Sequence, residues 1–174
     1  MQLEQFKKIT PNLNSTKVEL YFPLLQGAMD EFSISTPARE AAFIAQLAHE
    51  SVGLTAFEEF ASGKQYEGRK DLGNTKAGDG VRYKGRGAIQ LTGRGNYRTV
   101  GTALGLDLEN NPKLAADPNV AFRIAGYFWQ SKKLNELADK KEFDAITKKV
   151  NGGFNGKASR DAYYLKAKQI LGVK

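Results

Sequence analysis

Residues 36–59 read TPAREAAFIAQLAHESVGLTAFEE, and the rest of the chain is best understood outward from this stretch. Its first part carries the signals of a helix with a defined start and end. Thr36 is a good N-cap, and Pro37 suits the first helical turn because the N–H it lacks would be unpaired there anyway. No further Gly or Pro occurs until Gly53, which provides a stop. The stretch therefore predicts a helix over residues 36–52 followed by a tight bend.

One face of this helix ends in a carboxylic acid. Phe43, Leu47 and Glu50 are spaced i, i+4, i+7 and share a face that is apolar until its last member. Glu50 also falls at the C-terminal end, where the helix dipole is negative, and both settings disfavour the ionised carboxylate. A glutamic acid that keeps its proton suits general acid catalysis. Glu58 and Glu59 follow across the bend, and a pair of carboxyl positions indicates glycoside hydrolysis; on spacing alone, solvated surface groups are the alternative.

Composition narrows the class of protein. The chain has 174 residues, of which 41% are hydrophobic, and we expect one globular domain over residues 1–174. Zero Cys and a single His, His49, argue against a zinc site, so we expect no metal and no cofactor. The net charge of +7 favours an anionic partner such as nucleic acid, an anionic membrane or bacterial wall. No transmembrane window and no secretory signal are evident.

The remaining chain has mainly helical periodicity. Residues 1–34 predict two amphipathic helices, the second capped by Asn14 or Ser15 and kinked or broken near Tyr21 because Pro23 lies inside it. Further helices are predicted at residues 96–104, 120–132, 134–138, 143–150 and 159–171, with a helical turn at 114–116. The fold class expected is therefore mainly α, with a minor β hairpin.

The β element is expected inside a glycine-rich region. Nine of the chain's 18 glycines fall in residues 63–95, where continuing aromatic residues indicate an ordered functional loop rather than a linker. Within it, AIQL at residues 88–91 and then Thr92 alternate apolar and polar, which predicts a short strand with Gln90 and Thr92 facing one side of a cleft. The region matches neither GxxxxGK[ST] nor GxGxxG, so a nucleotide site is not expected.

The same region raises a rival hypothesis. Four arginines interleave with two tyrosines, an arrangement able to bind single-stranded nucleic acid through charge and stacking. These residues are Arg82, Arg86, Arg94, Arg98, Tyr83 and Tyr97. No helix-turn-helix or RNP-like motif supports this hypothesis, and we expect no nucleic-acid partner.

Three stretches together resemble glycoside hydrolase family 19, the chitinase-like family that also contains many phage endolysins. They are AHESVGLTAFEE (48–59), YEGRKDLGNTKAGDGVRYKGRGAIQLTGRGNY (66–97) and VNGGFNGKASR (150–160). They occur in family order, and the similarity is greatest to short lysozyme-type members. The resemblance implies a mostly helical, lysozyme-like, two-lobed domain.

The resemblance also implies roles for individual residues. Glu50 matches the general acid, Glu59 the general base that activates water, and Thr92 a residue that helps hold that water. We expect the substrate to be bound by His49, Tyr83, Arg86, Gln90, Asn96, Tyr97, Asn151 and Arg160. Two departures, Val52-Gly53-Leu54 in place of Gly-Gly-Phe and the identity of Phe60, concern the sugar subsites.

We therefore expect an inverting, muramidase-type endolysin that hydrolyses β-1,4 bonds of bacterial peptidoglycan. A chitinase is the alternative among enzymes, and a non-catalytic glycan- or nucleic-acid-binding module is the alternative outside them. We expect a monomer, made without a signal peptide in a host cytoplasm and released to the wall or periplasm. Lys166 and Lys168 are expected to contact anionic envelope while Arg160 serves the fold or cleft; a solvated helix face is the competing interpretation of the two lysines.

Overall fold

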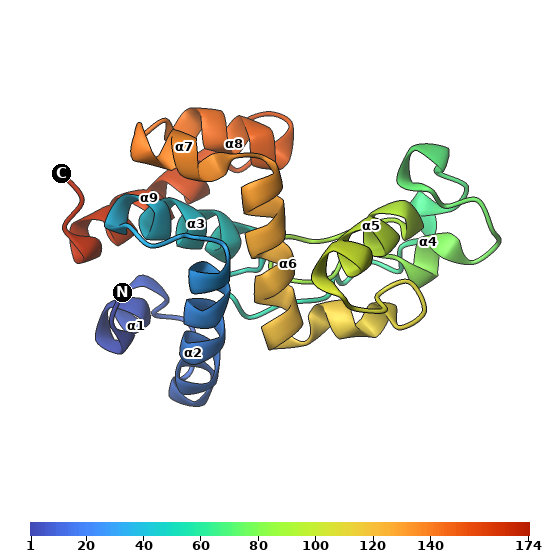
Figure 1. The fold of residues 1–174 in the computed structure, drawn as a ribbon, viewed down its shortest axis with the longest axis horizontal. Coiled ribbons are helices and arrows are strands. Elements are labelled where there is room, and N and C mark those ends of the chain that lie inside the picture. Colours follow the sequence, from blue (N-terminus) through green and yellow to red (C-terminus); the bar gives the residue numbers. More distant parts are fainter.

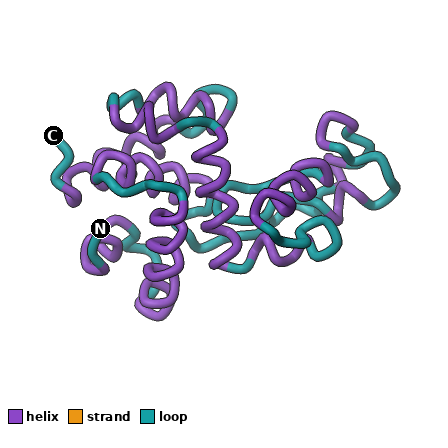
Figure 2. Tube along the Cα trace, in the orientation of Figure 1, coloured by secondary structure: helices purple, strands orange, loops and turns teal.

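The computed structural model describes residues 1–174, which form helices connected by loops (Figures 1 and 2). The α-helices are α1 (Leu3–Ile9), α2 (Ser15–Glu31), α3 (Pro37–Glu50), α4 (Asp79–Arg82), α5 (Arg94–Leu104), α6 (Pro118–Ser131), α7 (Leu134–Asp139), α8 (Phe143–Asn151) and α9 (Lys157–Leu171). The 3₁₀ helices are η1 (Lys64–Tyr66), η2 (Lys70–Leu72) and η3 (Pro112–Ala116). This confirms the mainly helical prediction, and no helix has the length and apolar character needed to cross a membrane.

Helix α3 lies at the centre of the larger of two hydrophobic cores. Thr36 caps it by accepting a hydrogen bond from the Arg39 amide at 3.3 Å, as its N-cap signal predicts. Its positions 41–48 are all buried, and a helix that is buried on every side belongs inside a helical assembly. Phe43 meets Trp129 of α6 edge to face, with ring centroids 5.2 Å apart. Helix α3 packs most extensively against α9, which brings the C-terminal part of the chain beside the end of α3.

A smaller lobe extends away from this assembly and holds α4, α5, η1, η2 and their loops (Figure 1). It has its own core of six buried residues: Tyr83, Tyr97, Val100, Leu108, Ala115 and Ile124. Helix α6 contributes to both cores, through Ile124 to this one and through Phe122 and Trp129 to the larger one. The chain therefore has two cores joined along one helix.

The β structure is shorter than the alternation of residues 88–92 predicts. Arg86 and Leu91 exchange both backbone hydrogen bonds, at 3.0 and 2.7 Å, and residues 87–90 form the turn between them. Gln90 lies in this turn with a left-handed φ of 56°, so the prediction of a strand over 88–91 is wrong. Two isolated bridges, Glu58–Arg86 and Arg86–Leu91, are the whole of the β pairing. The glycines around the turn supply local bends that an alternation pattern does not register.

Of the kink or break predicted near Tyr21, the break is absent. Helix α2 continues through Pro23, and the side chain of Asn14 caps its start by accepting from the Lys17 amide at 2.9 Å. Proline has no N–H, so the carbonyl four residues before Pro23 lacks its helical hydrogen bond. Because Pro23 is exposed, water can bind that carbonyl instead. Buried residues on both sides of it, including Val18 and Leu25, hold the helix together.

Candidate active site

Glu50 is the last residue of α3 and is held there by α9. The buried guanidinium of Arg160 donates from Nη2 to Glu50 Oε1 at 2.5 Å and from Nη1 to Gln46 Oε1. These contacts join residues 110 positions apart in the chain. Oε2 of Glu50 accepts no hydrogen bond from the protein, and the side chain of Glu50 is 22% exposed. A positively charged guanidinium therefore lies beside Glu50, where the apolar face of α3 predicts only apolar neighbours.

Glu59 is held mainly by uncharged donors. Its Oε2 accepts from the backbone N–H of Gly85 at 2.9 Å and from the hydroxyl of Tyr66 at 3.1 Å. Its Oε1 accepts from the side-chain amide of Gln65 at 3.3 Å. The backbone N–H of Glu59 also donates to the Gly85 carbonyl at 3.0 Å. Gly85 therefore fixes both the backbone and the carboxylate of Glu59.

Glu58 has a different set of partners from its neighbour. Its Oε1 lies 3.0 Å from Lys84 Nζ and 3.3 Å from Arg86 Nη2. Burial alone would raise the pKa of Glu58, but the hydrogen bond from Lys84 and the charge of Arg86 outweigh it and lower that pKa. Two cations thus neutralise Glu58, whereas none of the hydrogen bonds to the Glu59 carboxylate comes from a charged group.

Glu50 and Glu59 line one open pocket of about 350 Å³, which we call the catalytic pocket. The residues around it come from the end of α3, from the following loop, from η1 and from the 87–90 turn. They are Glu50, Val52, Ala56, Glu58, Glu59, Phe60, Ala61, Gln65, Tyr66 and Gln90. Glycoside hydrolysis needs two carboxyl groups that face one cavity, one as acid and the other as base or nucleophile.

Three predicted residues of the 88–96 segment form a chain of hydrogen bonds. Gln90 lines the catalytic pocket and donates from Nε2 to the Gly87 carbonyl at 3.1 Å. The Thr92 hydroxyl donates to the Gln90 carbonyl at 3.0 Å, and Asn96 Nδ2 donates to the Thr92 carbonyl at 2.7 Å. Thr92 is not among the residues that line the catalytic pocket, so a water held by its hydroxyl stays a prediction.

Tyr83 and Tyr97, both predicted to bind substrate, are buried inside the smaller lobe, so substrate contact by either ring stays a prediction that burial argues against. Tyr83 is 1% exposed and Tyr97 0% exposed, because the two rings pack edge to face in the smaller core. The Tyr83 hydroxyl donates to the Glu109 carbonyl, and the Tyr97 hydroxyl to the Lys84 carbonyl. Burial raises the pKa of Tyr97 to about 12. Arg86, also predicted to bind substrate, is 4% exposed and donates to Tyr97 at 3.3 Å.

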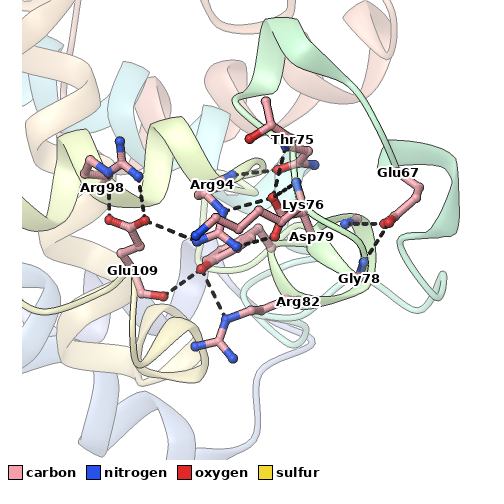
Figure 3. Close-up of polar contacts among 12 residues, drawn as sticks. Glu67, Thr75, Lys76, Gly78, Asp79, Arg82, Arg94, Arg98 and Glu109 are labelled. Carbon is pink, nitrogen blue, oxygen red and sulfur yellow. Dashed lines mark hydrogen bonds and ion pairs between the residues drawn. The ribbon is translucent and has the colours of Figure 1, made fainter.

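Two further arginines of the rival hypothesis, Arg94 and Arg98, are engaged in ion pairs (Figure 3). Arg94 pairs with Asp79 and Glu109, and its guanidinium lies 4.7 Å from the Tyr83 ring centre. Arg98 donates to Glu109 at 2.7 Å, and this hydrogen bond is the main cause that lowers the pKa of Glu109 to about 2. Because Tyr83 and Tyr97 are both buried, neither ring is open to stack on a base.

His49 and the loop before α9 lie near the Glu50–Arg160 pair. The ring of His49 abuts Gly156, where an added Cβ would stand 2.2 Å from His49 Cε1. The pKa of His49 is lowered, mainly by burial and also by the charge of Arg160. The charge of Glu50 acts in the opposite direction but is the smallest of the three effects. Asn151 Nδ2 is buried and has no hydrogen-bond partner. It is a donor that a substrate oxygen would satisfy.

The sequence prediction missed the residues that hold the two carboxylates. Tyr66, Gln65 and Gly85 position Glu59, and Gln46 shares the guanidinium of Arg160 with Glu50. Only Tyr66 and Gly85 lie within the stretches that carry the family resemblance. No group of three or more His, Cys, Asp or Glu side chains is placed to hold a metal ion.

Helix α9 carries the basic residues predicted to meet the envelope. Lys157 is paired with Asp144 and Asp161, and Lys168 lies 5.5 Å from the ring centre of Tyr164. Arg160 is buried and belongs to the site. Contact of Lys166 and Lys168 with an anionic envelope stays a prediction.

A two-lobed helical fold with two glutamates facing one pocket defines a glycoside hydrolase of the lysozyme-like type. The sequence model described as chitinase class I, of glycoside hydrolase family 19, matches residues 22–141. The chain therefore belongs to glycoside hydrolase family 19.

Relatives and solved structures agree with this assignment. The chain is 28% identical over 190 residues to a glycosyl hydrolase family 19 domain-containing protein of Haemophilus influenzae, with 91% of each chain covered. It is 37% identical over 154 residues to an Arabidopsis thaliana endochitinase, covering 84% of this chain and 53% of that protein. Among solved structures, a bacterial family 19 chitinase superposes with a TM-score of 0.83 at 27% identity, covering 99% and 95% of the two chains. Chitinase C of Streptomyces griseus has a TM-score of 0.81 at 28% identity, covering 98% and 76%.

Proposed function

We propose that this family 19 hydrolase cleaves the β-1,4 glycosidic bonds of bacterial peptidoglycan with inversion, as a muramidase-type endolysin. The observation that supports the chemistry is the shared pocket of Glu50 and Glu59. Glu50 protonates the leaving oxygen, for which its Oε2 is free of protein partners. Glu59, oriented by Gly85 and Tyr66, removes a proton from the attacking water. Inversion uses one carboxyl as acid and the other as base in this way.

Charge supports peptidoglycan as the substrate. The chain carries a net charge of +7, and peptidoglycan carries carboxylates on its peptide stems, whereas chitin is uncharged. The second candidate is chitin, because the Arabidopsis and Streptomyces relatives are described as chitinases. Both polymers contain N-acetylglucosamine. With peptidoglycan as substrate, the site of action is the cell wall or periplasm.

The test compares two substrates with one protein. Permeabilised bacteria are followed by turbidity, and chitooligosaccharides by release of shorter sugars. We expect clearing of the bacteria and slower cleavage of chitin, with α-anomeric product formed first in an NMR time course. Glu50→Gln keeps the shape of the side chain and should lower the rate about 10²–10⁴-fold. Efficient chitin cleavage without clearing would assign the enzyme to chitin, and an initial β-anomer would refute inversion.

A further inference from the structure

A second cavity, of about 590 Å³, lies in the smaller lobe and shares no residue with the catalytic pocket. Its charged residues are three cations and one acid, which are Arg82, Arg86, Lys113 and Asp117. Asparagine and apolar side chains complete it, namely Val81, Asn110, Asn111, Pro112 and Leu114. We call it the basic cavity.

The cations of the basic cavity have unused hydrogen-bond donors. Arg86 is 4% exposed, yet its Nε is buried without a partner. Arg82 donates from Nε to the Tyr83 hydroxyl and from Nη2 to the Asn110 carbonyl, which leaves Nη1 without a protein partner. Lys113 is exposed and forms no ion pair. A buried donor that lacks a partner is costly, so an anionic acceptor here would be bound favourably.

The acid of the cavity does not neutralise these cations. Asp117 is the N-cap of α6, and its Oδ1 accepts from the backbone amides of Asn119 and Val120. Its charge therefore acts on the helix N-terminus, where a negative group is stabilising. The cavity keeps a net positive lining.

We propose that the basic cavity binds a carboxylate-bearing peptide, namely the peptide stem of the glycan strand being cleaved. This inference rests on the proposed function. Val81 and Leu114 are 46% and 43% exposed at the cavity and would cover the aliphatic part of such a peptide, while the cations take its carboxylates.

The position of the basic cavity relative to the catalytic pocket supports this assignment. Arg86 lines the basic cavity and Glu58 lines the catalytic pocket, and their side chains lie 3.3 Å apart. The Glu58–Arg86 ion pair thus joins the lining of one cavity to the lining of the other. In this proposal the stem of a sugar bound in the catalytic pocket extends past this ion pair into the basic cavity, at about 3.3 Å per extended residue.

The experiment uses the whole protein, isotopically labelled for NMR titration, with three probes. These are the free stem peptide, an acidic peptide of the same length built from L-residues, and a chitooligosaccharide. We expect the stem peptide to shift the amide signals of Arg82 and Lys113, and the chitooligosaccharide to shift those around Glu59. Lys113→Glu should weaken stem-peptide binding about tenfold or more, because it replaces an attraction with a repulsion, and should leave chitooligosaccharide binding unchanged.

A matched control is Lys140→Glu, which makes the same charge change at an exposed lysine beside the end of α7. It should leave both ligands unaffected. Wild-type stem-peptide affinity in Lys113→Glu, or stem-peptide shifts confined to the catalytic pocket, would overturn the proposal. Equal affinity for the acidic L-peptide would overturn the assignment to the stem. Because binding is read without turnover, failure here is distinguishable from failure of the peptidoglycan assignment, which the clearing assay measures.

Discussion

Gly85→Ala tests whether the position of the Glu59 carboxylate governs catalysis. A Cβ at Gly85 would stand 2.5 Å from Glu59 Oε2 and 2.7 Å from Gln90 Oε1. The carboxylate must retreat by about 0.9 Å to reach the 3.4 Å of ordinary van der Waals contact. A misplacement of about 1 Å costs on the order of 10²-fold in rate, which is about 2.7 kcal/mol of barrier. We therefore expect kcat/KM to fall about 100-fold.

The fold should tolerate the same change. Gly85 does not have a left-handed φ, so alanine brings no backbone strain there. Alanine restricts the unfolded chain, which raises the free energy of unfolding by about 0.4–1 kcal/mol. The close contact in the folded state lowers it by about 1–3 kcal/mol. Thermal unfolding and cell clearing are measured on the same samples. Gly27→Ala is the control, because its Cβ would meet nothing within 4 Å and should leave activity unchanged. A folded Gly85→Ala enzyme with wild-type kcat/KM would refute the idea that Gly85 positions the base.

The other predictions concern Glu59, the loop before α9 and acid stability. Glu59→Gln should abolish clearing while Glu58→Gln leaves most of it, since Glu58 is neutralised by cations; the reverse ranking in a turbidity assay would exchange their roles. Gly156→Ala should destabilise more than Gly152→Ala in thermal unfolding, because both have a left-handed φ but only the first meets a side chain, at 2.2 Å; equal losses would contradict this. The pKa of Glu109 is lowered from 4.5 to about 2, so its stabilisation is present above about pH 4.5 and is lost as pH falls toward 2. Glu109→Gln should therefore flatten the acid side of a Tm–pH curve, and an unchanged curve would count against the pairing with Arg98.

Helices were predictable where the local signals agree with each other. Helix α3 forms as expected because its signals are local and agree. Thr36 and Pro37 favour its start, and no helix-breaking residue follows until Gly53. Pro23 shows the limit of the same reasoning, because packing on both sides outweighs one lost hydrogen bond. The strand predicted at 88–91 failed because Gln90 adopts a left-handed conformation that its residue type does not announce.

The site was less predictable because its supports come from distant parts of the chain. The partner of Glu50 is Arg160, 110 residues away, and the apolar stripe of α3 contains no information about which residue α9 presents to it. The family resemblance predicts that Tyr83 and Tyr97 bind the substrate. In the structure their rings instead form part of the smaller core. From sequence alone, a tyrosine in a loop region is equally suited to packing in a core and to contacting a substrate.

The two carboxylates are held by different parts of the molecule. Glu50 is anchored by a helix that is buried on all sides and by a guanidinium from the larger core, so its position depends on the packing of α3 against α9. Glu59 is anchored by the amide of Gly85 and the hydroxyl of Tyr66, which belong to the smaller lobe. A change in the angle between the lobes would therefore alter the separation of acid and base without breaking either set of contacts. The proposed inverting mechanism requires room for one water between the carboxyls, so under that proposal the packing of α6 into both cores bears on mechanism as well as on stability.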